Sequence, residues 1–258
     1  MMSQMSNRHH KLLGLPVWQG NKSTLKNLIL SEAEYLELFS INAEICIGQR
    51  NNDLWHKILS ENKMNLIDGQ WAKKILEWKY NERFEKLSGS DLIYDFCELA
   101  QRNNKKIFFL GASQQVADKA ILNLRDKYTG IPCFSYSPPF EGKSISREVT
   151  MIILAKIKEF QPNYLIACLG APKQEIWLYQ NRGSLRKIGV EVVMGAGGSL
   201  DFVSGILPRA PLWVQKTGFE WLYRLYKEPW RWRRQLNSIP HFFLLSILDI
   251  LKYRFLSK

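Results

Sequence analysis

The chain has 258 residues, 46% of them hydrophobic, and a formal charge of +12. This length and apolar content suffice for one well-filled core, so they predict a single globular domain with an appendage and argue against several domains. The charge is regional, since residues 209–258 hold ten Lys and Arg against three Asp and Glu, and it predicts an acidic partner there: a phosphate, a nucleic acid or an anionic membrane surface.

The N-terminus and the cysteines bear on the cellular compartment. Residues 1–15 contain no long apolar stretch followed by a small-residue cleavage site, so no secretory signal is visible. The four cysteines lie far apart, form no Cys-x-x-Cys pair and fall mostly inside apolar runs; they are Cys46, Cys97, Cys133 and Cys168. This pattern is typical of reduced core thiols and indicates a cytosolic setting.

Five short apolar runs predict buried strands. The first two are 35–44 (YLELFSINAE) and 64–69 (MNLIDG), each followed by a helix-like stretch. Three later runs, 106–113 (KIFFLGAS), 164–172 (YLIACLGAP) and 190–198 (VEVVMGAGG), each end in a Gly-Ala turn before a helix-like segment. Runs without polar alternation suit strands that are covered on both faces, so the sequence predicts a doubly wound α/β fold with a parallel sheet.

One Pro/Gly/Ser-rich break interrupts this rhythm. It is SYSPPFEGKS at 135–144. We interpret it as a mobile active-site loop and not as a domain boundary.

Ligands of such sheets bind outside the carboxyl ends of the strands, so the groups just past each run are candidates. Glycines there permit close backbone approach, and helix N-termini offer free N–H groups to a phosphate. The alternative is that the Gly-Ala pairs are ordinary tight turns, since neither GxGxxG nor GxxxxGK[ST] is present. The candidates are Ser40, Asn42, Asp68, Gly69, Gly111 to Ser113, Gly170, Lys173, Gln174, Glu175 and Gly195 to Ser199.

Asp68 has two interpretations. It follows Asn65-Leu66-Ile67 and precedes a glycine, so it falls at a strand mouth, where partial burial raises a carboxyl pKa and prepares the group to take a proton. Alternatively, Asp68 caps the helix that starts near Gln70.

The stretch 220–236 (EWLYRLYKEPWRWRRQL) holds four arginines and three tryptophans in seventeen positions. Arg224, Arg231 and Arg234 are spaced seven and three apart, so they share one side of a helix if the turn resumes after 228–229. Three guanidinium groups that face an active site can neutralise a diphosphate. The alternative is that these arginines form a solvated face.

Residues 239–248 (IPHFFLLSIL) form the most apolar segment, about half the uncharged length that a spanning helix needs. The segment therefore cannot span a membrane, but it can lie in a membrane interface. We expect Trp230 and Trp232, with Phe242 and Phe243, to seat it at the headgroup level. The alternatives are a helix packed on its own domain or on a dimer partner, and tryptophans that fill a core cleft.

The sequence lacks several motifs that would indicate a familiar reaction chemistry. The four histidines form no HExxH motif or paired ligand spacing, and no GxSxG marks a nucleophile elbow. There is also no Asp-x-Asp, by which many nucleotide-sugar transferases hold a divalent cation. The sequence favours a mechanism without a metal.

Several motifs follow one another in a specific order between about Gly14 and Arg234. They are Ser40-Ile41-Asn42-Ala43-Glu44, Ile67-Asp68-Gly69, Ser88-Gly89-Ser90-Asp91-Leu92, LGAPKQE at 169–175, GAGGSLDF at 195–202, Arg209-Ala210-Pro211 and the stretch 220–236. In this order they resemble the WecG/TagA/CpsF glycosyltransferase family, whose pattern includes LGxPkQE, GaGgxxDfxxG, RAPxW and glEWlyRlxxEPxRxxR. So many motifs in register are highly specific.

The resemblance implies a Rossmann-like catalytic domain over 1–208 and a C-terminal appendage, 209–258, that touches the membrane and helps to close the active site. It implies inverting, metal-independent transfer from a UDP-sugar to a hydroxyl of a polyprenyl-diphosphate-linked saccharide, without a cofactor, in cell-surface polysaccharide synthesis. The sugar is typically N-acetylmannosamine or its uronic acid, and the acceptor sugar N-acetylglucosamine. The expected location is cytoplasmic, peripheral to the inner face of the cell membrane, and a homo-oligomer stays open.

The resemblance also assigns roles to residues. Asp68 falls on the position of the catalytic base, and Ser40 falls where the family usually has Thr, which keeps the hydroxyl. Asn42 and Gln174 match residues of the substrate pocket. Lys86 stands where a pocket Arg is common, so the charge is kept but the planar bidentate fork is lost. The other predicted substrate-binding residues are Glu175, Gly197, Gly198, Arg209, Arg224, Arg231 and Arg234.

Two alternative functions remain at this point. One is the same fold acting on UDP-glucuronate or another UDP-hexose in capsule or exopolysaccharide assembly. The other is a basic α/β nucleic-acid-binding protein whose Arg/Trp stretch contacts phosphates and stacks on bases. The confinement of the charge to one region argues against nucleic acid as the partner, as do Gly-rich strand ends that would have no task.

Overall fold

A computed structural model of the protein describes residues 10–31, 35–139, 142 and 144–256. Within these residues, six parallel strands form the central sheet in the order β4-β3-β8-β7-β5-β6. Their bounds are β3 (Leu36–Ile41), β4 (Met64–Ile67), β5 (Ile107–Gly111), β6 (Cys133–Tyr136), β7 (Tyr164–Cys168) and β8 (Val192–Gly195). All five predicted strands are present, and the predicted α/β fold with a parallel sheet is confirmed.

Strand β6 falls where the sequence predicts the start of a loop. It lies at the sheet edge and pairs with β5 alone, and only Cys133 among its residues is buried. An edge strand exposed in this way has no continuous apolar run to identify it. A short hairpin of β1 (Lys11–Leu12) and β2 (Leu15–Pro16) was likewise not predicted. The predicted absence of a secretory signal concerns mainly residues 1–9, which lie outside the described residues.

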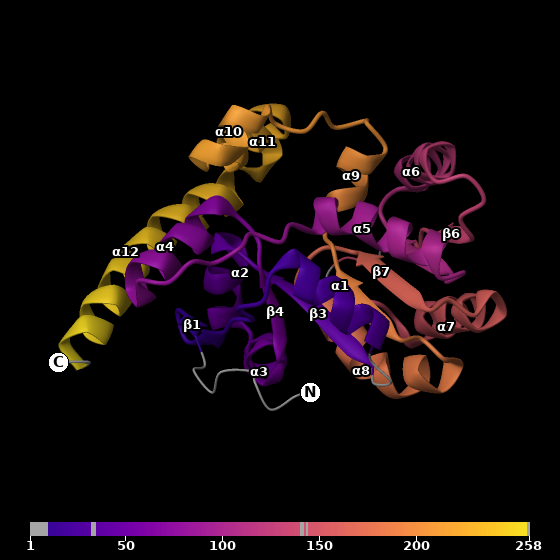
Figure 1. The fold of residues 1–258 in the computed structure, drawn as a ribbon, viewed down its shortest axis with the longest axis horizontal. Coiled ribbons are helices and arrows are strands. Elements are labelled where there is room, and N and C mark those ends of the chain that lie inside the picture. Colours follow the sequence, from indigo (N-terminus) through magenta and orange to yellow (C-terminus); the bar gives the residue numbers. More distant parts are fainter. Residues whose placement is uncertain (1–9, 32–34, 140–141, 143, 257–258) are drawn as a thin grey trace.

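Helices cover both faces of the sheet (Figure 1). Alternate strand residues enter two cores, with Phe108 and Leu110 on one face and Ile107 and Phe109 on the other. The first core packs against α2 (Ala43–Gly48), α3 (Asp53–Glu61), α4 (Gln70–Tyr80), α7 (Arg147–Phe160) and α8 (Lys173–Ile188). The second packs against α1 (Lys22–Ser31), α5 (Gly89–Arg102), α6 (Gln114–Lys127) and α9 (Ser199–Val203). All four cysteines are buried and free, as expected.

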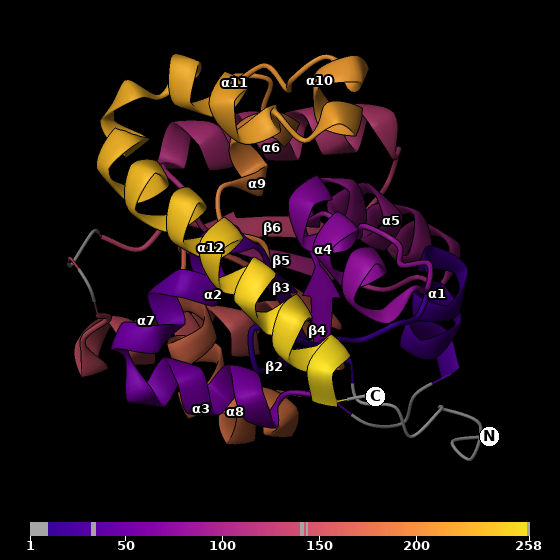
Figure 2. The same ribbon diagram turned by 90° about the vertical axis from the view of Figure 1, so that its left-hand side faces the viewer.

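The C-terminal region folds back along the first face. It comprises α10 (Leu212–Thr217), α11 (Glu220–Lys227), a 3-10 turn (Pro229–Arg231) and α12 (Trp232–Leu256). Helix α12 crosses over α2 and α4 in a long diagonal (Figure 2). None of the helices in the described part of the chain is long and apolar enough to cross a membrane. The predicted boundary at residue 208 stays a prediction.

The expectation that Phe242 helps to seat the C-terminal segment at the headgroup level of a membrane is wrong, and for the half-buried Phe243 it stays a prediction. Phe242 is fully buried in the first core, and Phe243 packs edge-on against Trp71 with the ring centroids 4.9 Å apart. The inner face of α12 is therefore part of the protein's own core, which was the alternative prediction for this helix. Its removal would open that core.

Candidate active site

A cavity of about 480 Å³ lies at the carboxyl ends of the strands. One wall, which we call the strand-end wall, consists of residues that follow β3, β4, β5, β7 and β8. The other, the arginine wall, comes from α11, the 3-10 turn and α12. The chain leaves β8 toward one face of the sheet and leaves β3 and β7 toward the other. A crevice opens where neighbouring connections diverge in this way, which is where such sheets bind ligands.

The strand-end wall presents backbone to the cavity. Helices α4, α5 and α9 begin there, after Gly69, Ser88 and Gly198, and no side chain of these residues caps its helix. The first N–H groups of each helix lack an intrahelical partner, and the positive ends of the helix dipoles face the cavity. This wall is therefore suited to anionic oxygens.

Gln174 holds the turn after β8. Its Oε1 accepts from the backbone N–H of Gly197 at 2.9 Å, and its Nε2 donates to Glu175 Oε1 at 2.8 Å. Gly195 leaves the room for this arrangement, because a Cβ there would lie 2.8 Å from Gln174 Nε2. Burial raises the pKa of Glu175 to about 7. Gln174 lines the cavity, while Glu175 lies behind it and orients the amide.

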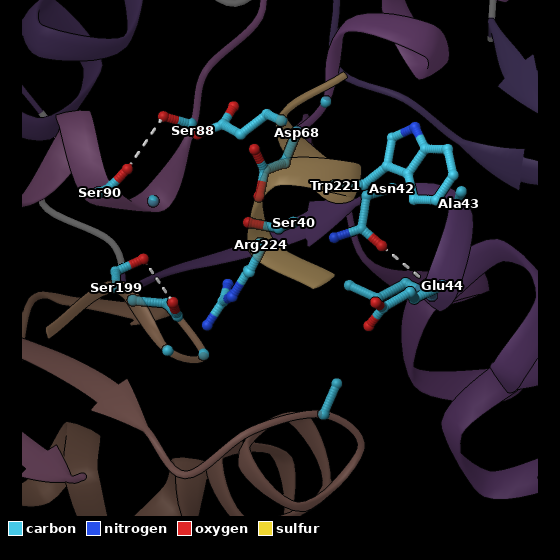
Figure 3. Close-up of a pocket in the computed structure, with 18 of the residues that line it drawn as sticks. Ser40, Asn42, Ala43, Glu44, Asp68, Ser88, Ser90, Ser199, Trp221 and Arg224 are labelled. Atoms are coloured by element: carbon cyan, nitrogen blue, oxygen red, sulfur yellow. Dashed lines mark hydrogen bonds between the residues drawn. The ribbon is translucent and has the colours of Figure 1, made fainter. Parts of the chain in front are cut away.

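Asp68 and Ser40 meet at the ends of two neighbouring strands. The backbone N–H of Asp68 donates to the carbonyl of Ile41 at 2.9 Å, which continues the β3–β4 pairing. Figure 3 shows the Asp68 carboxylate pointing into the cavity on the side of Ser40. The residue that caps α4 is Gly69, with a φ of +105°, so the capping interpretation of Asp68 is wrong.

The pKa of Asp68 is raised to about 6, mainly because burial disfavours the charged carboxylate. The cation of Lys86 lowers this pKa, and the carboxylate of Glu220 raises it. A carboxylate with a pKa near neutrality is suited to take a proton from a hydroxyl.

Asn42 also lines the cavity from the end of β3. Its Oδ1 accepts from the backbone N–H of Ile45 at 3.0 Å and so caps α2. Because the oxygen is fixed in this way, the amide nitrogen is directed toward the cavity (Figure 3).

Three guanidinium groups dominate the arginine wall. Arg224 Nε lies 2.6 Å and Arg231 Nη1 3.3 Å from Glu228 Oε2, and Arg234 Nη2 lies 2.8 Å from Glu44 Oε2. Burial, with the charges of Arg224 and Arg234, lowers the pKa of Arg231. The buried Nε of Arg231 has no hydrogen-bond partner in the described part of the chain. The three arginines line one cavity, but they lie in α11, the 3-10 turn and α12 and not on one side of a continuous helix. Their crowded positive charge is one that a bound anion would relieve.

Three residues predicted to bind substrate do not line this cavity. Glu175 is buried behind Gln174, and Lys86 Nζ lies 3.7 Å from Glu220 Oε2. Arg209 donates to both carboxylate oxygens of Asp91 and so ties the segment after α9 to the start of α5. Direct binding of substrate by these three residues stays a prediction, and the contacts seen are with protein groups. Gly197 and Gly198 do line the cavity.

The predicted active-site loop at 135–144 does not contribute to the cavity with its described residues. Residues 140–141 and 143 lie outside the described residues. Carboxylates were the groups that sequence reasoning missed. Glu44, Asp201 and Glu220 all line the cavity and each contacts a basic side chain. These three carboxylates belong to the motifs quoted above, but the sequence around each of them does not indicate that it pairs with a basic side chain.

No group of three His, Cys, Asp or Glu side chains among the described residues is placed to hold a metal ion. The predicted mechanism without a metal stays a prediction.

Comparison with known proteins gives one family and several relatives. A model of the Glycosyl transferase WecG/TagA/CpsF family matches residues 10–255. The chain is 29% identical over 210 residues to the N-acetylglucosaminyldiphosphoundecaprenol N-acetyl-beta-D-mannosaminyltransferase of Bacillus subtilis (strain 168), covering 81% of this chain and 78% of that protein. It is 29% identical over 220 residues to the protein of the same name from Bacillus spizizenii, covering 85% and 82%. For the one from Staphylococcus aureus (strain MW2) the identity is 27% over 207 residues, covering 80% and 78%.

Proposed function

This chain belongs to the glycosyl transferase WecG/TagA/CpsF family and is a glycosyltransferase, and we propose that it moves N-acetylmannosamine, or its uronic acid, from a UDP-sugar to a hydroxyl of a polyprenyl-diphosphate-linked saccharide. The names of its relatives support both the sugar and the lipid-linked N-acetylglucosamine acceptor. The observation that carries the proposal is one cavity with Asp68 on one wall and three crowded guanidinium groups on the other. A base and a diphosphate site are the two things that this transfer needs.

In the proposed reaction, Asp68 takes the proton of the acceptor hydroxyl as its oxygen attacks the anomeric carbon of the donor. The bond from that carbon to the UDP oxygen breaks on the opposite side, so the configuration inverts. Ser40, beside Asp68, positions the attacking hydroxyl, and Asn42 donates to the bound sugar. A pKa of about 6 keeps Asp68 mostly ionised at neutral pH and still basic enough to accept the proton.

The departing UDP carries new negative charge on its diphosphate. Arg224, Arg231 and Arg234 can bind the diphosphate with paired N–H donors. To do so, each guanidinium group has to leave the carboxylate that it contacts in the structure. The helix N-termini of the strand-end wall add partial positive charge. On these grounds we propose that transfer needs no divalent cation, and full activity after removal of metals by EDTA is the expected result.

The acceptor's polyprenyl chain has to stay in a bilayer, and we propose that the outer face of α10–α12 contacts an anionic membrane surface peripherally, on the cytoplasmic side. Leu212, Trp213, Tyr226 and Trp230 are 72%, 69%, 77% and 73% exposed. Lys216, Lys227 and Arg233 are interspersed among them. Indole and phenol groups favour the headgroup layer, and basic side chains favour anionic lipid.

Partition onto anionic vesicles, compared with binding to single-stranded DNA at about 150 mM salt, separates the membrane from a nucleic-acid partner. We expect vesicle binding that is weakened by Trp213→Ala with Trp230→Ala. Tight DNA binding without vesicle binding would favour the nucleic-acid alternative.

The function itself is tested by a UDP-release screen of the purified protein. A panel of UDP-sugars is offered with a synthetic short-chain lipid diphosphate N-acetylglucosamine as acceptor. Acceptor-dependent release from UDP-N-acetylmannosamine or its uronic acid is expected. Release from UDP-glucuronate alone would support the alternative donor, and no release from any donor would contradict the proposal.

A further inference from the structure

The lining of the catalytic cavity changes from charged to apolar along α12. Near the start of the helix, Arg234 and Gln235 line the cavity. Further along, the lining residues are Ile239, Phe242 and Phe243, of which Phe242 is fully buried and the other two are half-buried. At a rise of about 1.5 Å per residue, Phe243 lies roughly 14 Å beyond Arg234 along the helix axis. One helix therefore offers a charged stretch and then an apolar stretch to the same cavity.

Two tryptophans complete the apolar part. Trp71 comes from the first turn of α4 and Trp221 from α11, and both are half-buried and line the cavity. The rings of Trp71 and Phe243 meet edge-on with their centroids 4.9 Å apart. We call Trp71, Trp221, Ile239 and Phe243 the aromatic end of the cavity. Apolar surface of this kind indicates an apolar part in the ligand, which neither a sugar nor a diphosphate supplies.

The phosphate-binding groups of the strand-end wall gather in a different corner. Helices α5 and α9 belong to the second face of the sheet, and their starts adjoin, since a Cβ on Gly89 would lie 3.0 Å from Ser199 Oγ. Arg224 Nη2 reaches the same corner, because a Cβ on Gly198 would lie 2.5 Å from it. The aromatic end lies instead over the first face, where Trp71 and Phe243 pack against the core.

Asp68 lies at the end of β4, directly before α4, whose first turn carries Trp71. Inversion requires the attacking hydroxyl and the departing UDP to lie on opposite sides of the anomeric carbon. With UDP at the corner of α5 and α9, the acceptor therefore approaches from the side of α4 and α12. This is the side of the aromatic end.

The aromatic end also adjoins the outer surface of α10. Gly218, which ends α10, packs on the indole of Trp71, and a Cβ there would lie 2.8 Å from Trp71 Nε1. The next residue, Phe219, is 47% exposed, and α10 itself carries the exposed Trp213. This part of the cavity therefore borders the face for which membrane contact is proposed.

We propose that the aromatic end binds the first isoprene units of the acceptor's lipid chain, while the rest of the chain stays in the bilayer. The inference rests on the proposed function, which makes the acceptor a polyprenyl diphosphate. In such a molecule the diphosphate continues directly into a branched hydrocarbon chain, and α12 presents guanidinium and apolar groups in that order. Burial of the first units against these side chains supplies affinity that does not depend on a membrane.

The test uses two acceptors with the same N-acetylglucosamine diphosphate head, one a farnesyl ester and the other a methyl ester. Their KM values are measured with the full chain in solution, without vesicles or detergent. Trp71→Ala and Ile239→Ser probe the aromatic end. Trp78→Ala is the matched control, because Trp78 is 57% exposed on the same helix as Trp71 and does not line the cavity.

We expect the wild type and Trp78→Ala to have a KM for the farnesyl acceptor at least about tenfold below that for the methyl acceptor. Trp71→Ala should reduce this ratio about tenfold and Ile239→Ser about threefold, because each removes apolar contacts with the chain. The affinity for UDP, measured by calorimetry, should not change. General damage to the site would raise both KM values together and leave their ratio as in the wild type.

Equal KM values for the two acceptors in the wild type would overturn the proposal, and so would a ratio that Trp71→Ala and Ile239→Ser both leave unchanged. If Trp71→Ala does not fold, the half-buried Ile239 decides alone. A loss of UDP affinity in Trp71→Ala at an unchanged ratio would assign the aromatic end to the uracil base, which also contradicts the proposal.

Failure of the proposed function gives a different result, namely no transfer to either acceptor from any donor. Calorimetry of farnesyl diphosphate and methyl diphosphate then decides about the lipid site. Tighter binding of the farnesyl compound that Trp71→Ala abolishes would support the lipid site in the absence of transfer. Equal binding of the two compounds would remove it.

Discussion

The two walls of the catalytic cavity are built on different principles. The strand-end wall consists largely of backbone and short side chains, and the pairing of β3 with β4 fixes the backbone of Ser40 and Asp68. The arginine wall consists of long side chains whose positions depend on carboxylates, with Arg234 held by Glu44 and Arg231 by Glu228. The difference suggests a division of labour. Proton transfer depends on position to a fraction of an ångström, whereas neutralisation of a diphosphate tolerates adjustable donors.

The largest effect is expected from a substitution in the strand-end wall. Asp68→Asn keeps the shape of the side chain but removes the base, so turnover should fall about 10²–10⁴-fold while the affinity for UDP barely changes. Single-turnover transfer and UDP calorimetry on the same preparation measure both quantities. A folded Asp68→Asn protein with near-normal turnover would remove Asp68 from the mechanism.

A smaller effect is expected from a substitution in the arginine wall. Arg231→Gln removes one charge-assisted donor among three, so kcat/KM should fall about 10- to 100-fold, with UDP affinity falling as well. Arg233→Gln is the matched control, because Arg233 is exposed, stacks on Trp232 and does not line the cavity. Equal losses in the two variants would mean that only the overall basic charge of the segment matters.

The turn after β8 belongs to the strand-end wall, and its role is tested by a substitution that adds one methyl group. Gly195→Ala pushes against Gln174 Nε2 and should break its contact with Gly197, raising KM for the UDP-sugar about 2- to 10-fold. Gly183→Ala is the control, since its added methyl group meets nothing within 4 Å. That change should leave KM alone and stabilise α8 by about 0.5–1 kcal/mol. If Gly195→Ala behaves like its control, Gln174 does not position the turn.

The smallest expected effect is on the pH dependence of activity, because the charges of Lys86 and Glu220 act on the pKa of Asp68. The ionised form of Asp68 is the active base, so activity should fall as the pH drops through about 6. Lys86→Gln removes a cation that lowers this pKa and should move the acid limb of the profile to higher pH. Glu220→Gln removes an anion that raises the pKa and should move the limb lower. Each shift should be below about one pH unit, and shifts in the same direction would show that another group controls the limb.

What could be predicted from the sequence was local. Five strands were found because both of their faces are buried, and β6 was missed because it is an edge strand with one buried residue. An Asp before a Gly suits both a strand mouth and a helix cap, and only the pairing of β3 with β4 decides between them for Asp68.

Long-range partners could not be predicted. Glu44 and Arg234 form an ion pair although they are far apart in the chain. Phe242 was expected to be exposed because its neighbours in sequence are apolar and basic, yet the helix turns it into the core.

In the proposed mechanism, Asp68 acts as a base in a single displacement and not as a nucleophile. The most direct test is the anomeric configuration of the product formed by the wild type, determined by NMR from the one-bond C1–H1 coupling of the transferred sugar. We expect a configuration opposite to that of the UDP-sugar donor. Retention of the donor's configuration would contradict it, because retention requires a second displacement or a different path on the same face.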